Sequence, residues 1–396
     1  NVTATSGSAR DIQVAVNHVA AADGIGKVFI PDGTFNFVEV GEDWMTVEIP
    51  AGVNLFGAPT ERDADGQVVE WKTVLVMPYD VPGDWYSTPY WFRITGNGDP
   101  NKPSRFSDIK LVGYRSIDPT SVTVHRGVII DRVIDFRIDH CHFEHICGGA
   151  ITAWAQFPDP GGPVQGCRGV IDHCNLINKY GYVVAMSMED TVGYGVAVGR
   201  AYGDVWEDDI TKVLGKYTDY SVYIEDCYFE KWRHCIAANS GAHYVIRHSI
   251  IKDDYGFGSL DAHGWGAWDG TKITQVGTRA IEVYNCQMLD PYNPDAPQRD
   301  AIFLRGGACI AFGNVVTGYY IFITAGREAA PEVSKCYPHD IYVWSNELPD
   351  GVEPVHATTN EKGTPEEGVD YFLHAPHTFD YEPYPYPHPL TLETTP

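Results

Sequence analysis

Basic side chains are scarce in this sequence of 396 residues. It has 28 Lys and Arg against 53 Asp and Glu, and its formal net charge at pH 7 is −25. A chain of this sign repels polyanions, so nucleic acid is not an expected partner. No apolar run is long enough to span a bilayer, and no initial Met or signal peptide is present. We therefore expect a mature secreted chain, extracellular or at the cell surface.

The sequence also lacks any C-x-x-C pair, although it has nine cysteines. This absence argues against a cysteine-based zinc site. Four of the cysteines occupy one position of a recurring pattern, where we interpret them as reduced and buried thiols. A disulfide between Cys147 and Cys167 is an alternative for two of the others.

A six-residue pattern recurs seven times in the second half of the chain. It consists of an apolar residue, two polar or mixed residues, a Cys, Ser or Asn, any residue, and a second apolar residue. Side chains of a straight strand return to the same face every second residue, so a step of three between inward residues requires a bend between two short strands. The pattern therefore predicts an inward stack of small residues, which we call the ladder: Cys141, Cys174, Cys227, Ser249, Cys286, Asn314 and Asn346.

The spacing of the ladder residues indicates a solenoid. The shortest separation, from Cys227 to Ser249, fits one bare coil of three short strands and three bends, and the longer ones add loops at the corners. In the longest interval, from Cys174 to Cys227, residues 191–200 alternate apolar and small side chains, so we expect a further coil there.

The N-terminal segment predicts a short amphipathic helix, at about residues 6–22, that caps the first coil. Ser8 and Asp11 have the spacing of a capping box, and Ile12, Val16 and Val19 form an apolar stripe. Residues 28–35 then read as a strand, a turn and a second strand. The helix, the stacked Asn residues and strings such as VYNCQM resemble the right-handed parallel β-helix proteins of the pectin-lyase-like superfamily.

We therefore expect an all-β fold, with a single right-handed parallel β-helix domain at residues 1–350. Residues 351–396 are rich in Pro, Tyr and His, and such a composition does not suit ladder strands. They are expected to form an extended tail, packed on the solenoid or on a neighbouring molecule.

Alternation aligns the strands expected on one face of the solenoid. The inward positions are assigned to Ile151, Val183, Ile236, Leu260, Ile302 and Ile321. One outward column then contains Trp154, Met186, Asn239, His263, Arg305 and Thr324. Its companion column contains Thr152, Val184, Ala237, Asp261, Phe303 and Phe322. Coils stack about 4.8 Å apart, so Asn239, His263 and Arg305 should form a polar row on successive coils.

This row supplies the candidate catalytic residues His263, Arg305, Asp261 and Asn239. A lyase needs a base that titrates near neutral pH and a cation beside the enolate that it forms, and histidine and arginine supply these. The resemblance implies a saccharide groove along the outward strand face. The candidate substrate-binding residues are Trp154, Lys231, Arg233, His234, Trp265, Trp268, Arg279 and Glu282.

Other interpretations compete with these. His263 beside Asp261 also fits a structural pair, and Arg279 with Glu282 fits a plain salt bridge. Calcium, which takes oxygen ligands, is a candidate cofactor at Asp208, Asp209, Asp253 and Asp254, although solvated charge explains these acidic groups as well. The calcium-binding and catalytic motifs of pectate lyases and the polygalacturonase motifs are not found, so no catalytic residue is carried over from those enzymes.

The leading hypothesis is an extracellular protein that binds or cleaves a polysaccharide or cell-surface glycan. If it is an enzyme, β-elimination is favoured over glycoside hydrolysis. The alternative is a non-catalytic surface protein, such as a fibre, sheath or adhesin subunit, that self-assembles through its tail.

Overall fold

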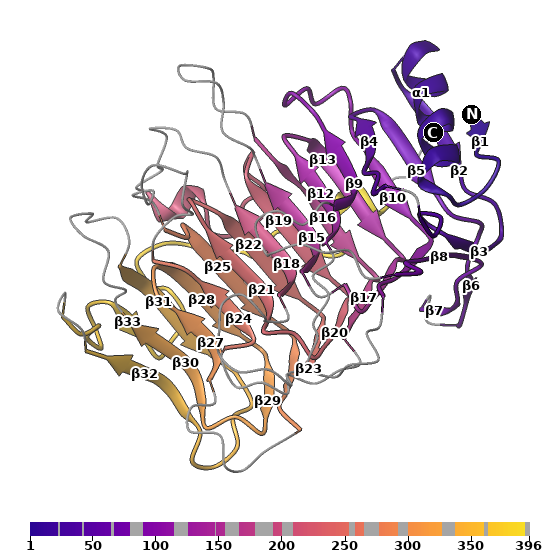
Figure 1. Cartoon of the computed structure of the whole chain (residues 1–396). Coiled ribbons are helices and arrows are strands. Elements are labelled where there is room, and N and C mark those ends of the chain that lie inside the picture. The colour runs from indigo at the N-terminus through magenta and orange to yellow at the C-terminus, as the bar shows by residue number, and fades with distance from the viewer. Residues whose placement is uncertain are drawn as a thin grey trace.

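The chain forms a right-handed parallel β-helix, in which three long sheets wind around one apolar core (Figure 1). In the computed structural model, the residues described are 1–22, 24–41, 43–64, 67–79, 90–114, 126–146, 148–154, 166–178, 193–199, 209–252, 258–264, 277–291, 300–326, 337–359 and 363–392. The predicted fold class is confirmed by the strand pairing. Among these residues no helix has the length and apolar character that crossing a membrane requires.

Except at the two ends of the solenoid, each coil contributes one strand to each of the three sheets, which we call A, B and C. Sheet A consists of β1 (Val2–Thr3), β2 (Gly26–Phe29), β5 (Val53–Phe56), β10 (Arg105–Ser107), β13 (Ile134–Asp139), β16 (Arg168–Asp172), β19 (Ser221–Glu225), β22 (His243–Arg247), β25 (Ala280–Tyr284), β28 (Gly307–Phe312), β31 (Pro338–Trp344) and β33 (Tyr371–Phe372). Sheet B consists of β3 (Gly33–Asn36), β8 (Thr73–Val76), β11 (Ile109–Val112), β14 (His142–Glu144), β17 (Asn175–Ile177), β20 (Tyr228–Glu230), β23 (Ile250–Lys252), β26 (Gln287–Leu289) and β29 (Val315–Thr317). Sheet C consists of β4 (Val47–Pro50), β9 (Tyr90–Thr95), β12 (Arg126–Asp131), β15 (Gly149–Trp154), β18 (Tyr194–Gly199), β21 (His234–Asn239), β24 (Leu260–Ala262), β27 (Asp300–Leu304), β30 (Ile321–Gly326) and β32 (Glu353–Thr358).

Few elements lie outside these sheets. The predicted cap is the helix α1 (Ala9–Ala22), whose Ile12, Val16 and Val19 are buried. The backbone N–H of Asp11 donates to Ser8 Oγ, as the capping-box spacing predicts. An antiparallel pair of β6 (Glu61–Arg62) and β7 (Val68–Glu70), a 3₁₀ turn at Ile210–Lys212 and a short helix, α2 (Pro389–Leu392), complete the described elements.

The bend between sheets A and B is made by one residue with left-handed backbone, placed directly before each ladder residue. Six of these residues are not glycine, although a positive φ is uncommon for other residues. They and their φ angles are His140 (54°), His173 (52°), Asp226 (55°), His248 (51°), Asn285 (56°), Ser345 (53°) and, as the one glycine, Gly313 (66°). This conformation shifts the alternation of side chains by one position. The ladder residue that follows therefore points inward, as the pattern predicts.

The ladder itself is buried along its length, except at Asn346, which is half-buried. Its thiol members are free, as are Cys167, Cys235 and Cys309; Cys147 and Cys336 lie outside the described residues. The polar members bind the neighbouring coil. Asn314 Oδ1 accepts a hydrogen bond from the backbone N–H of Cys286 (3.0 Å), and Asn346 Oδ1 accepts one from the N–H of Asn314 (3.0 Å). The ladder thus satisfies backbone donors that the bend removes from the sheets.

The described part of the segment 191–200, residues 193–199, does not add a further coil, contrary to expectation. Residues Tyr194–Gly199 are the strand β18, but it belongs to sheet C in the same coil as β16 and β17. The sheet A strand β16 pairs directly with β19. Among the described residues, no sheet A strand lies between β16 and β19, so these two strands belong to successive coils.

The sheets also extend beyond residue 350, the expected end of the solenoid. The strand β32 pairs in parallel with β30, and β33 pairs with β31. The part without ladder strands begins after Phe372, and we call residues 373–392 the strap.

The strap lies along the outer face of sheet A and crosses several coils toward the N-terminal half. Phe379 packs edge-on against Tyr342 of β31, and Tyr381 packs against Trp344 and Phe312. At its far end, α2 packs on β13 and β16. The described part of the tail is therefore packed on its own solenoid.

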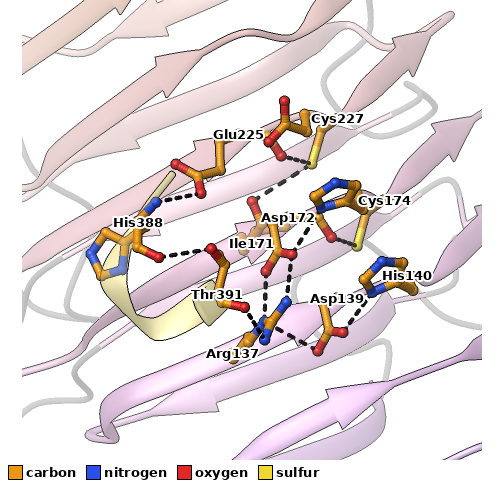
Figure 2. A network of polar contacts seen from close by, with 12 residues as sticks. Arg137, Asp139, His140, Ile171, Asp172, Cys174, Glu225, Cys227, His388 and Thr391 are labelled. Atoms are coloured by element: carbon orange, nitrogen blue, oxygen red, sulfur yellow. Dashed lines mark hydrogen bonds and ion pairs between the residues drawn. The ribbon is translucent and has the colours of Figure 1, made fainter. Parts of the chain in front are cut away.

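The strap also completes a series of buried charged groups on sheet A. Arg247, which is fully buried, forms an ion pair with Glu225 (2.7 Å) and donates to the backbone oxygens of Tyr384 (2.6 Å) and Pro385 (2.8 Å). Figure 2 shows two further links, from the N–H of His388 to Glu225 and from Arg137 to the backbone oxygen of Thr391. Without the strap, these arginine and carboxylate groups would lose partners that burial makes necessary.

A first prediction concerns the ladder. Replacing Cys227 by Asp places an unpaired carboxylate in the core, whereas Ser keeps the size and the hydrogen-bonding ability of the thiol. We expect Cys227→Asp to lower the free energy of unfolding by several kcal/mol, and Cys227→Ser to have a small effect. Thermal unfolding measures both, with Thr317→Asp at an exposed position of β29 as control. An unchanged melting temperature for Cys227→Asp would refute the inward assignment.

A second prediction concerns His388, whose ring lies among Tyr217, Tyr223 and Tyr384 at centroid distances of 4.6, 5.0 and 5.2 Å. Burial, assisted by Arg247, lowers its pKa to about 3. An unfolded histidine binds a proton below about pH 6.5, and the folded one does not until about pH 3. Its contribution to stability is therefore present above pH 6.5 and lost as the pH falls toward 3.

The measurement is the free energy of unfolding at pH 7 and pH 4 for the wild type and for His388→Gln. We expect the drop on acidification to be smaller in the variant by up to about 3 kcal/mol. His234, whose pKa is also lowered, is present in both proteins and cancels in the comparison. Equal drops would show that the His388 ring takes up its proton as freely in the fold as in the unfolded chain.

Candidate functional site

The candidate site is the outer face of sheet C where β21, β24 and β27 lie side by side. The register places Ala237, Asp261, Phe303 and Thr324 in one column. Two residues further along each strand, Asn239, His263 and Arg305 follow in the same register, next to Gly199 of β18. His234 and Asp300 lie three residues before Ala237 and Phe303, respectively. The predicted row of Asn239, His263 and Arg305 thus lies at the end of these strands, with Asp261 beside it.

Asp261 is the centre of the site and is fully buried beneath its partners. Arg305 Nη2 lies 2.8 Å from Oδ2 and 3.0 Å from Oδ1 of this carboxylate, and Arg305 Nε lies 3.2 Å from Oδ1. His263 Nε2 lies 2.9 Å from Oδ2. Burial alone would raise the pKa of Asp261, but Arg305, His263 and His234 lower it well below its usual value. The carboxylate is therefore ionised.

His263 is placed between a donor and an acceptor. Its Nε2 lies 2.6 Å from Arg305 Nη2 and 2.9 Å from Asp261 Oδ2. One nitrogen cannot accept from the guanidinium and donate to the carboxylate at the same time. A neutral ring accepting at Nε2 suits Arg305, and a ring with a proton on Nε2 suits Asp261. The two contacts therefore favour different tautomers of the imidazole.

Arg305 and His263 are the members of this group that reach solvent. Their side chains are 17% and 20% exposed, respectively, whereas Asp261 has no exposed surface. The Arg305 guanidinium also lies over the Phe303 ring, 4.9 Å from its centroid, which restricts its orientation. A ligand on sheet C would meet the imidazole and the guanidinium first, and Asp261 would act by positioning them.

His234 is held as a neutral ring next to this group. Its Nδ1 donates to the backbone oxygen of Gly258 (2.6 Å), and Tyr194 stacks on it with 5.7 Å between centroids. Burial lowers the pKa of His234 to about 4, although Asp261, whose Oδ2 is 3.8 Å from Nε2, raises it. His234 is expected to bind the substrate, but it is buried. It lies next to Asp261.

Sequence reasoning missed Asp300 at the start of β27. It is buried, and desolvation raises its pKa, while a hydrogen bond from Thr324 opposes that shift. A signal was present, because an acidic residue directly precedes the apolar strand AIFL. Asp300 adds a second carboxyl group near Asp261. Its pKa is raised, whereas the pKa of Asp261 is lowered.

Asn239 and Trp154 are placed in the same row as expected. Asn239 pairs with Gly199, and Gly199 pairs with Trp154. Asn239 Oδ1 is buried and has no hydrogen-bond partner within the described part of the chain. The row of Trp154, Gly199, Asn239, His263 and Arg305 therefore runs along the solenoid axis.

Comparison with known proteins establishes no family for this chain. No protein-family model matches the sequence, and a comparison with curated proteins finds no match. Among solved structures, it is similar to the surface adhesin PfbA of Streptococcus pneumoniae, with 11% identity and a TM-score of 0.46 over 85% of this chain and 81% of the adhesin. An alginate lyase from Paenibacillus sp. str. FPU-7 has 11% identity and a TM-score of 0.39 over 90% of this chain and 98% of the lyase. An exopolygalacturonase from Thermotoga maritima has 9% identity and a TM-score of 0.41 over 86% and 78%.

These likenesses are too distant to transfer an activity. The site is therefore interpreted from its own residues.

Part of the predicted register is wrong by two residues. Thr324 lies in the column of Asp261 and Phe303, where Phe322 was expected, and Gly326 takes the place assigned to Thr324. Ile323, not Ile321, is the inward partner of Ile302. The slip keeps the face pattern, because a shift of two residues leaves every side chain on the same side of a strand. Val183, Val184 and Met186 lie outside the described residues, and β18 occupies their expected place.

Glu282 and Arg279 do not belong to the site. Glu282 is buried on the outer face of sheet A, where it accepts from the N–H of Gly215 (2.8 Å) and from Tyr381 Oη (2.6 Å) and lies 3.0 Å from His243 Nε2. Arg279 is buried at the corner between sheets C and A. The predicted pairing of the two is replaced by these contacts, because alternation alone does not tell which sheet a strand joins.

Lys231 and Arg233 lie at the corner before β21 and are half-buried. Lys231 Nζ is 3.8 Å from Glu230 on sheet B, and Arg233 lowers the pKa of His234 through its charge. Arg233 is thus the one of the two with an electrostatic link to the Asp261 group.

Several candidates cannot be placed. Trp265, Trp268, Asp208, Asp253 and Asp254 lie outside the described residues. Asp209 is described, and its carboxylate caps the 3₁₀ turn by accepting from the N–H and the hydroxyl of Thr211. The proposed calcium ligand is thus already engaged within the chain.

One cluster of metal-ligating types lies on another corner of the solenoid: Asp139, His140 and Asp172. Each carboxylate already binds an arginine, Asp139 with Arg105 (2.6 Å) and Asp172 with Arg137 (2.9 Å), as Figure 2 shows in part. Buried carboxylates that are neutralised by guanidinium groups do not need a metal ion.

A third prediction concerns Asp261. Asp261→Ala leaves the Arg305 guanidinium and His263 without their common acceptor, so we expect the free energy of unfolding to fall by about 3 kcal/mol. Glu353→Ala, which removes a half-exposed carboxylate from an ion pair with His356, should change it little. Chemical denaturation compares the two. A neutral outcome for Asp261→Ala would show that the group is not held together by this carboxylate.

Proposed function

We propose that this protein is an extracellular β-helix protein that binds a polysaccharide along sheet C and cleaves it by β-elimination. The observation that carries the proposal is the group of His263 and Arg305, partly exposed above a buried and ionised Asp261. It supplies a base and a cation within one hydrogen-bond network at the edge of a long, flat sheet.

The reaction would use a sugar that carries a carboxyl group. His263 takes the proton from the carbon next to that carboxyl group, and the electron pair moves into the carboxylate as an enolate. The electrons then form a carbon–carbon double bond, the glycosidic C–O bond breaks, and the departing oxygen takes up a proton from water. General-base catalysis and charge stabilisation are the contributions that such a reaction needs.

The charge balance of the group suits this step. The charges of Arg305 and Asp261 compensate each other, and the role of base requires His263 to be a neutral imidazole. When His263 gains the proton, the group becomes positive by one unit at the moment when the substrate acquires an additional negative charge. The Asp261 carboxylate, 2.9 Å from Nε2, stabilises the imidazolium that forms.

Glycoside hydrolysis fits this site less well. It commonly needs two carboxyl groups that face the sugar, one to protonate the leaving oxygen and one to act as base or nucleophile. Asp261 is fully buried and its oxygens are engaged by Arg305, and Asp300 is also buried. The groups that reach solvent are a histidine and an arginine.

The alternative, a self-assembling surface protein, receives no support from the described part of the tail. The strap makes its contacts with sheet A of the same chain, through Tyr381, Tyr384 and His388 among others. Binding of a glycan without cleavage remains part of the proposal's test, as does calcium, which the assays should include and omit in parallel.

The fourth prediction tests the activity. A panel of uronate-containing polysaccharides, including alginate and polygalacturonate, is incubated with the protein, and the unsaturated product is followed by its near-ultraviolet absorbance. We expect His263→Ala and Arg305→Ala each to lower the rate by about a hundredfold or more. Variants His339→Ala and Arg62→Ala, at ion pairs away from sheet C, should keep the wild-type rate.

Circular dichroism and the melting temperature show whether each variant is folded. Full activity in both site variants, or no cleavage of any polymer by the wild type with or without calcium, would overturn the lyase assignment.

A further inference from the structure

We infer that Trp154 is a stacking platform for one sugar unit of the same polysaccharide, three coils away from His263. This inference rests on the proposed function and adds a binding subsite to it. It is carried by the contact of Trp154 with Gly199 and by the register of sheet C.

Trp154 ends β15, and its register partner on the next coil is Gly199. The indole lies over this glycine: a Cβ at position 199 would collide with Cζ3 and Cε3 of the ring. Any larger residue at this position would push the indole away from the sheet. The glycine thus lets the ring lie along the solenoid axis, with the side chain partly exposed.

The ring lies in line with the proposed catalytic group. From Trp154 the row continues through Gly199 and Asn239 to His263, one coil at a time. Each step is about 4.8 Å, so three steps separate the indole from the base by about 14 Å. Arg305 lies one further step away.

The spacing and the chemistry favour a pyranose chain as the occupant. A pyranose unit is close in length to the spacing of one coil, so a chain along the axis places successive sugars above successive strands. The C–H groups on one face of a pyranose pack well on an indole, and the hydroxyl groups at its rim stay in contact with water. A chain that is cleaved at His263 would therefore place a sugar three units away on Trp154.

This arrangement makes the affinity depend on chain length. Oligosaccharides that extend from His263 to Trp154 gain the stacking contact, and those too short to reach it do not. Because the contact lies far from the bond that breaks, it should affect KM and leave kcat largely unchanged.

The experiment compares Trp154→Ala, Trp154→Phe and Gly199→Ala with the wild type on disaccharides to octasaccharides of the polymer that is cleaved in the panel. We expect Trp154→Ala to raise KM about tenfold for hexasaccharides and longer chains, with no change for trisaccharides. Trp154→Phe should recover much of the loss. Gly199→Ala keeps the indole but displaces it, so it should behave like Trp154→Ala. The matched control is Tyr320→Ala, which removes an exposed aromatic residue directly before β30, away from the row.

A second readout does not depend on turnover. In the His263→Ala background, affinity electrophoresis in gels that contain alginate or polygalacturonate measures binding directly, and Trp154→Ala should reduce the retardation. Equal KM values and equal retardation with and without Trp154 would overturn the platform while leaving the lyase assignment intact. If the wild type cleaves no polymer but retardation still depends on Trp154, the lyase assignment is overturned and the platform is kept. No retardation of any variant, including the wild type, would overturn both.

Discussion

The left-handed bend between sheets A and B is the constraint on which the rest of the structure depends. It places one residue of positive φ before each ladder residue, at His140, His173, Asp226, His248 and Asn285 among others. Because every coil that carries a ladder residue turns at the same point, its strands are presented to their neighbours in the same register, and side chains stack in columns. The row on sheet C, from Trp154 to Arg305, is one such column. A functional site on this fold therefore requires no special loop, only suitable residues at equivalent positions.

Charge is distributed very differently on two of the faces. On sheet A, arginines and carboxylates such as Arg247 and Glu225 are fully buried, and the strap supplies their remaining hydrogen bonds. On sheet C, Arg305 and Asp261 form a comparable pair, but the guanidinium and His263 retain contact with solvent. Similar ion pairs thus stabilise the attachment of the strap on one face and remain accessible to a ligand on the other.

The sequence predicts the positions of residues that repeat from coil to coil. It does not predict positions that depend on which sheet a strand joins or on a single long-range contact. The ladder, the cap and the row of Asn239, His263 and Arg305 follow from local patterns, because each residue is placed by its own bend and strand. The extra coil at residues 191–200 was wrong because a strand of period two does not reveal which sheet it joins. Glu282 was misplaced for the same reason. Thr324 was misplaced by two residues, a shift that alternation cannot detect. The strap was expected to pack somewhere, but its partners on sheet A lie more than a hundred residues away in most cases and leave no local signal.

The burial of Asp261 explains why the group of three keeps its geometry. A carboxylate without solvent contact is stable only while Arg305 and His263 remain beside it, since an unpaired buried charge is costly. The same cost keeps both partners in place when a ligand approaches. Arg305 Nη2 (2.6 Å) and Asp261 Oδ2 (2.9 Å) both contact Nε2 of His263, so either tautomer of the ring keeps one of these hydrogen bonds at the same position. The orientation of the imidazole is thus maintained by the same electrostatics that stabilise the fold.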